Sequence, residues 1–233
     1  MSSPPIKRII HYNDVPQSGF AGIIERRMVL NPSYWSNSKD RSDISHGLGD
    51  FIYLALGQFL PNDGVPLHPH NDVDIVSVVF SGSVGHKGTL GDGTSIHAPE
   101  VQVQRSGTGM QHSEFNLNDT PADIAQLWFK PPKAGLEPKY KNFKINKNGL
   151  TTVLGGENGS FNSKMVCKVG YLSPGEDISV NQPFIILITQ GDGVANGVTV
   201  NKGDLIEGDS LQFVANHDLG LVLVYEVIEG DKH

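Results

Sequence analysis

The sequence predicts an all-β protein, and two observations carry that prediction. Glycine is abundant, with 27 of 233 residues, and it recurs in turn signals such as 91–93, 155–159 and 191–193. Between the turns lie short runs rich in valine, isoleucine, leucine and phenylalanine, at 75–80, 124–129, 184–189, 197–200, 211–214 and 221–227. Many short strands with glycine-rich turns are typical of sandwiches and barrels. The pattern contains no convincing amphipathic helix longer than about two turns.

A boundary between two parts of the chain is predicted near residue 133. Pro131 and Pro132 cannot donate to a sheet ladder, and the lysines that flank them suit an exposed connector. The following segment, 136–148, is polar and rich in lysine before strand-like patterning resumes. We therefore expect an N-terminal domain at residues 1–133 and a C-terminal domain at residues 134–233.

Charge and composition exclude several classes of partner and site. The formal net charge of −7 argues against nucleic acid and anionic membrane surfaces as partners. Cys167 is the only cysteine, which excludes an internal disulfide and a zinc–thiolate site, and we expect it to be a small buried residue. The chain has no apolar stretch near the roughly 18 residues of a membrane span. It also lacks a signal-peptide pattern, so we expect a cytoplasmic protein.

Two triplets stand out for their chemistry: His68-Pro69-His70 and, about forty residues later, His112-Ser113-Glu114. Side chains alternate between the faces of a strand, so residues two apart point the same way. Each triplet therefore offers two ligands to one side of a sheet. Pro69 suits the start of a strand or a bulge, where its missing N–H does no harm. Three imidazoles and one carboxylate form a ligand set for a divalent metal ion, with positions left for water or substrate.

The residues around the triplets point to a family. The first stretch reads Gly64-x3-His68-Pro69-His70-x3-Asp74-x7-Gly82, and the second reads Gly107-Thr108-Gly109-x2-His112-Ser113-Glu114. They resemble the two conserved motifs of the cupin superfamily, and more narrowly those of pirin and the short bacterial pirin-like proteins. The strand Gln126-Leu127-Trp128-Phe129 also looks like the family's. The resemblance is specific over residues 64–140, and it implies two cupin barrels, of jelly-roll-like double-stranded β-helix type, in one chain.

Carried over residue by residue, the resemblance implies the same four metal ligands as the spacing: His68, His70, His112 and Glu114. One departure concerns Asp74, because the family usually has glutamate at this position. A shorter carboxylate is expected to change the hydrogen bond made there, while the ligand set is expected to survive.

The other histidines have weaker claims. His86 and His97 flank the 91–93 turn, and we expect them near strand ends and facing solvent; the resemblance makes His86 a secondary candidate for lining the pocket. The C-terminal half has no second His-x-His and no carboxylate partner for His217, so we expect a degenerate, metal-free barrel there. Three further histidines stand alone: His11, His46 and His233.

The resemblance implies a metal-dependent dioxygenase of the pirin or quercetinase type. Several pirin-like proteins open the central ring of the flavonol quercetin with O2 and release carbon monoxide. We expect one divalent ion, with Fe(II) the first choice and Mn, Ni, Co, Cu or Zn as alternatives. Glu114 would be both a ligand and the catalytic base that takes the proton of the 3-hydroxyl group. The expected partners are a flavonol-like small molecule and O2.

Two other functions remain open. One is a non-catalytic, metal-binding regulatory or interaction protein, which would act through protein contacts because the chain is acidic. The other is a non-redox metalloenzyme such as an isomerase, since the cupin scaffold hosts many chemistries. Bleaching of a flavonol with uptake of oxygen would favour the dioxygenase, whereas a metal-dependent protein partner would favour the interaction protein.

Overall fold

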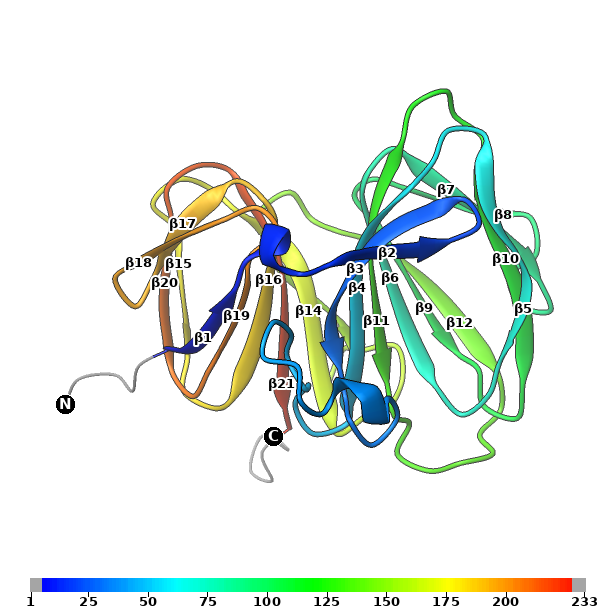
Figure 1. The fold of residues 1–233 in the computed structure, drawn as a ribbon, viewed down its shortest axis with the longest axis horizontal. Coiled ribbons are helices and arrows are strands. Elements are labelled where there is room, and N and C mark those ends of the chain that lie inside the picture. Colours follow the sequence, from blue (N-terminus) through cyan, green and yellow to red (C-terminus); the bar gives the residue numbers. More distant parts are fainter. Residues whose placement is uncertain (1–5, 228–233) are drawn as a thin grey trace.

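The computed structural model describes residues 6–227, and it confirms the all-β prediction. Within this range, twenty-one strands form four antiparallel sheets, accompanied by two short 3-10 helices, η1 (Tyr12–Asp14) and η2 (Ser36–Ser38). The sheets pair into two sandwiches that lie side by side (Figure 1). Among the described residues, no helix has the length and hydropathy needed to cross a membrane. The outer limits of both predicted domains, and His233, fall outside the described residues.

The first sandwich contains a seven-stranded sheet with the order β12-β9-β6-β11-β4-β3-β2 and a four-stranded sheet with the order β5-β10-β7-β8. The strands of the large sheet are β2 (Gln17–Phe20), β3 (Ile23–Leu30), β4 (Phe51–Phe59), β6 (Asp74–Ser81), β9 (Glu100–Arg105), β11 (Ala122–Phe129) and β12 (Lys139–Lys144). The strands of the small sheet are β5 (Asp63–His70), β7 (Ser83–Gly88), β8 (Thr94–His97) and β10 (Met110–Asn116).

The second sandwich contains a six-stranded sheet with the order β1-β19-β16-β21-β14-β13 and a four-stranded sheet with the order β15-β20-β17-β18. The strands of the large sheet are β1 (Ile6–Ile10), β13 (Gly149–Leu154), β14 (Met165–Leu172), β16 (Phe184–Gln190), β19 (Leu205–Gly208) and β21 (Leu219–Glu226). The strands of the small sheet are β15 (Asp177–Val180), β17 (Asp192–Ala195), β18 (Val198–Asn201) and β20 (Leu211–Ala215).

Two strands pair with partners on the other side of the predicted boundary at residue 133. The boundary itself stays a prediction. β12 follows this residue in the chain but lies at the edge of the first sandwich, where it pairs with β9. β1 lies near the start of the chain, within the predicted N-terminal domain, but it pairs with β19 of the second sandwich. β12 has no hydrophobic pattern in the sequence, because most of its residues are polar. Exposed lysines are common on edge strands, where they discourage further pairing.

The large sheets of the two sandwiches pack against each other, as Figure 1 shows. One core cluster joins Leu54, Val76 and Leu127 of the first sandwich to Cys167 and Val222 of the second. Cys167 is fully buried, as expected, and burial raises the pKa of its thiol. Because one face of each large sheet is covered by the other sandwich, the opposite face is left for the sandwich's own interior.

The two interiors are filled differently. That of the second sandwich is occupied by a large apolar cluster, including Phe184, Ile186, Phe213 and Leu221. The interior of the first sandwich has a small apolar cluster made by Phe59, Val65, Val79, Val84, Ile96, Ala122 and Ile124. That interior also contains a second small apolar cluster, Val73, Ile75 and Met110, together with polar side chains that include the predicted ligands.

Candidate metal centre

Strands β5 and β10 bring the two triplets side by side. In their antiparallel ladder His112 lies opposite His68, and Met110 lies opposite His70. Glu114 lies opposite Val65, so an advance of two residues along β10 corresponds to three residues along β5. β5 therefore bulges between His68 and Val65. β5 is also the edge strand of its sheet, where prolines such as Pro69 are tolerated.

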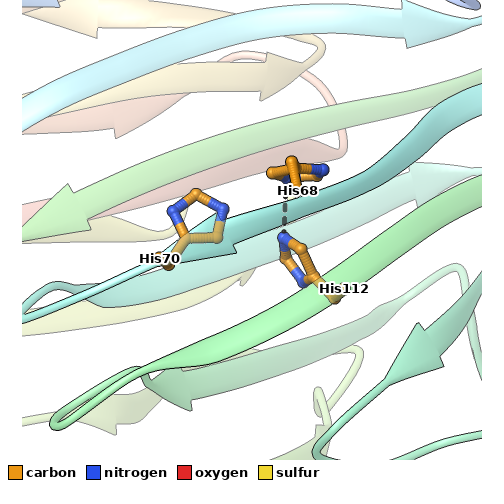
Figure 2. Close-up of side chains that lie close together, drawn as sticks. All are labelled: His68, His70 and His112. Atoms are coloured by element: carbon orange, nitrogen blue, oxygen red, sulfur yellow. Dashed lines mark hydrogen bonds between the residues drawn. The ribbon is translucent and has the colours of Figure 1, made fainter.

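Three of the four predicted ligands converge, as Figure 2 shows for His68, His70 and His112. Each offers a ring nitrogen, and these nitrogens all lie within 4.8 Å of one another. His112 Nε2 and His68 Nε2 are 3.0 Å apart. The three rings meet edge to face, with centroids separated by 4.5 to 4.9 Å.

Hydrogen bonds to two backbone carbonyls indicate which ring nitrogens carry protons. His68 Nδ1 lies 2.8 Å from the Pro66 carbonyl oxygen, and His86 Nδ1 lies 3.2 Å from that of Gly91. A carbonyl can only accept, so in the neutral rings both Nδ1 atoms donate and both Nε2 atoms carry lone pairs. His86 Nε2 lies 3.1 Å from His112 Nδ1, which must therefore donate to it. His112 Nε2 is then also left with a lone pair.

This arrangement fits a metal ion. When both rings are neutral, the lone pairs of His68 Nε2 and His112 Nε2 face each other at 3.0 Å, and a metal ion or a shared proton between them removes their repulsion. Two nitrogen ligands bound at right angles to one ion, each at about 2.1 Å, stand about 3.0 Å apart. Neutral imidazoles are ligands for Fe, Ni, Cu and Zn, so the chemistry of the donor set agrees with the spacing.

Burial favours the neutral form of His70, His86 and His112. It lowers the pKa of His70 to about 4 and the pKa of His112 to about 2, and the neighbouring histidines add to both shifts. Burial also lowers the pKa of His86. Protons compete with metals for imidazole nitrogens, so low pKa values leave these side chains ready to bind a metal at neutral pH.

Glu114, the fourth predicted ligand, lies inward on β10 like His112 but outside the compact group of three histidines. Its side chain is 5% exposed, and its two carboxylate oxygens accept hydrogen bonds from Gln126 Nε2 at 3.2 and 3.1 Å. Burial raises the pKa of the carboxyl group, while the hydrogen bond from Gln126 and the proximity of His68 act in the opposite direction. β11 of the facing sheet therefore orients this carboxylate.

His86 was expected to face solvent, and that expectation is wrong. The residue is 1% exposed and contacts His112, and Gln104 Nε2 also lies 2.9 Å from its Nε2. A signal for its burial is present in the sequence of β7, where Val84 and His86 alternate as inward residues before the exposed Lys87. The contact with His112 depends on pairing between β7 and β10, which no local pattern reveals.

Asp74 lies on the other face of the large sheet, toward the second sandwich. Arg105 Nε and Nη2 donate to its two oxygens at 2.8 and 2.6 Å, and Arg105 Nη2 also donates to the Asn162 carbonyl at 2.9 Å. The change from the family's usual glutamate therefore concerns the junction of the sandwiches.

His217 does have a carboxylate partner, contrary to expectation. Its Nδ1 lies 2.7 Å from Asp192 Oδ1 on the surface, because the turn at 216–218 folds back onto β17. This pair is exposed and belongs to the second sandwich, whereas the histidine cluster lies inside the first.

Comparisons with known proteins agree with this description. The family model described as Pirin matches residues 40–129. The Zymomonas mobilis protein named "Putative quercetin 2,3-dioxygenase ZMO1337" is 30% identical over 146 residues, which are 63% of this chain and 54% of that protein. Quercetin 2,3-dioxygenase of Escherichia coli is 35% identical over 84 residues, or 36% of each chain. The matches to the first such relatives thus span about half of their length or less.

Solved structures show a similar fold over nearly the whole chain. The crystal structure of YhhW from Escherichia coli has a TM-score of 0.81 at 20% identity, covering 97% of this chain and 99% of that one. The nickel(II) complex of the same protein, described as a bacterial pirin, has a TM-score of 0.80 at 21% identity and covers 93% and 97%. This likeness confirms the predicted two-barrel fold.

Proposed function

We propose that this chain is a pirin-like protein and that it is a metal-dependent dioxygenase that opens the ring of a flavonol with O2. The observation that supports this proposal best is the pair of facing lone pairs on His68 and His112, beside a buried carboxylate. Relatives named as quercetin 2,3-dioxygenases supply the reaction class.

The proposed metal ligands are His68, His70, His112 and Glu114. The three imidazoles already converge, and Glu114 would complete the set from the same strand as His112. With one carboxylate and three neutral nitrogens, the set suits a single divalent ion and leaves positions for exogenous oxygen ligands. We take Fe(II) as the first choice, with Mn, Ni, Co, Cu and Zn as alternatives.

The chain's own contribution to the reaction would be proton transfer and positioning. A bound ion would act as a Lewis acid on an oxygen substituent of the substrate. Glu114 would take the proton from the flavonol 3-hydroxyl group. Gln126 would hold the carboxylate in place through both of its oxygens.

Oxygen uptake and bleaching of quercetin test the proposal in protein loaded in turn with Fe, Mn, Co, Ni and Cu. At least one ion should support both signals, and Glu114→Gln should reduce turnover by about 100-fold or more, because the base is lost. His217→Ala, which changes an exposed histidine of the second sandwich, should leave turnover unchanged. If none of the ions supports oxygen uptake, the dioxygenase proposal is wrong and the interaction protein becomes the better hypothesis.

A further inference from the structure

Two inward-facing side chains of β11 remain partly open to solvent. Gln126 and Trp128 alternate with Leu127 and Phe129, which are buried in the core shared with the second sandwich. They therefore point between the two sheets of the first sandwich, where a closed interior would bury them fully. Both keep partial exposure, so this end of β11 is reached by solvent.

Aromatic rings form a continuous surface from the metal centre to solvent. The His70 and Trp128 rings meet at 83° with their centroids 5.3 Å apart. Trp128 stacks on Tyr53 at 4.5 Å and lies 6.1 Å from Trp35. Trp35 lies 6.0 Å from Tyr34, which is 51% exposed. Such ring separations are those of favourable aromatic pairs.

The loop that carries Trp35 is anchored. The Trp35 carbonyl accepts a hydrogen bond from Ser38 Oγ at 2.7 Å, and this hydroxyl, which is fully buried, also lies 3.0 Å from the Leu30 carbonyl. The Trp35 N–H donates to the Asn31 carbonyl at 3.0 Å. Trp35 therefore has a defined position at the end of the sandwich, although its ring remains partly exposed.

Gln126 links the aromatic surface to the proposed base. Its Nε2 donates to both oxygens of Glu114, and its Oε1 accepts from Trp128 Nε1 at 3.4 Å. The same amide thus orients the carboxylate and contacts the indole. A ring packed beside Trp128 and Trp35 would approach His70, whose ring meets Trp128 edge to face.

We propose that Tyr34, Trp35 and Trp128 form the wall on which a planar aromatic substrate stacks, with an oxygen substituent on the edge nearest His70. The inference rests on the proposed function of the metal centre and names the residues that select its substrate. Partly exposed aromatic side chains next to a few convergent polar groups are the usual composition of a small-molecule site. Rings that only filled the core would be covered, whereas Tyr34 is exposed and Trp35 is partly exposed.

Tryptophan fluorescence tests the wall directly, because Trp35 and Trp128 are the only tryptophans of the chain. Protein loaded with Zn(II), which has no redox chemistry, is titrated with quercetin, and free N-acetyltryptophanamide corrects for absorption by the flavonol. We expect saturable quenching. Trp35→Leu and Tyr34→Leu should each raise the Kd by about threefold to tenfold, the usual worth of one aromatic contact. Phe20→Leu is the matched control, with an exposed ring of similar accessibility (54%), and should leave the Kd unchanged.

Quenching that does not saturate would overturn the proposal, and so would a Kd in both wall variants equal to that of the unchanged protein. If Trp35→Leu loses its cooperative thermal transition, Tyr34→Leu, a surface change, carries the test alone. Oxygen uptake separates the two hypotheses. Binding that depends on Trp35 without oxygen uptake supports the wall and rejects the dioxygenase; uptake with an unchanged KM in both variants rejects the wall alone.

Discussion

At His112, the position of one proton decides whether the ring can bind a metal through Nε2. The proton must sit on Nδ1, and His86 Nε2 is the acceptor that holds it there. The Gly91 carbonyl fixes His86 in turn, by accepting from its Nδ1. A partner of this kind sets the tautomer and orientation of a metal-binding histidine.

Replacing His86 by leucine should weaken metal binding by about 10- to 100-fold, because His112 would lose the acceptor for its Nδ1 proton. His86→Gln retains an acceptor oxygen and should recover part of the affinity. Competition with a chromogenic chelator measures both values, using Zn(II) or Ni(II). His97→Leu, at an exposed histidine, is the control. Equal affinities for His86→Leu and the unchanged protein would show that His86 does not position the ligand.

The low pKa of His70 predicts how stability depends on pH in metal-free protein. Its pKa is about 4 in the folded state and about 6.5 in the unfolded chain, so the unfolded state takes the proton first. Its contribution to the free energy of unfolding should be complete above pH 6.5 and should fall as the pH drops toward 4. In urea unfolding at several pH values, the free energy of unfolding should fall less steeply with decreasing pH for His70→Asn than for the unchanged protein. Parallel curves would contradict the low pKa.

At the scale of elements, hydrophobic patterning located the strands whose faces are buried. The runs at 75–80, 124–129 and 184–189 fall within β6, β11 and β16, since packing on both sides of a large sheet selects apolar residues. The ligand triplets were predictable for the related reason that strand alternation is local. β12 was not predictable in this way, because an edge strand is held by hydrogen bonds to the backbone of its neighbour and needs no apolar face. Contacts between strands, such as His86 with His112, depend on sheet order, which no single segment encodes.

For the whole molecule, the junction of the sandwiches combines an apolar core with one buried ion pair. Arg105 and Asp74 lie on neighbouring strands of the first sandwich, and Arg105 also reaches Asn162 and the face of Phe161 in the second. Burial raises the pKa of Asp74, while the guanidinium opposes that shift. The pair therefore links two strands of one sheet and also contributes to the contact between the two sandwiches.

Arg105→Met should destabilise the protein by about 3 kcal/mol, because it leaves the Asp74 carboxylate buried without its partner. The loss should appear as a lower urea midpoint in one cooperative transition, since the sandwiches share a core. Lys139→Met, which breaks the exposed pair with Glu137, should leave the midpoint unchanged. Two separate transitions in the unchanged protein would contradict the shared core as the source of cooperativity.

The position of β1 has a consequence for how the chain is made. This strand is synthesised before every other described strand, yet its partner β19 lies near the other end of the chain, with Ile6 paired to Gly208. During translation β1 must therefore wait, unpaired, while the first sandwich and most of the second are produced. Domains generally fold as they emerge, so here the metal-binding sandwich can assemble well before the earliest strand finds its place.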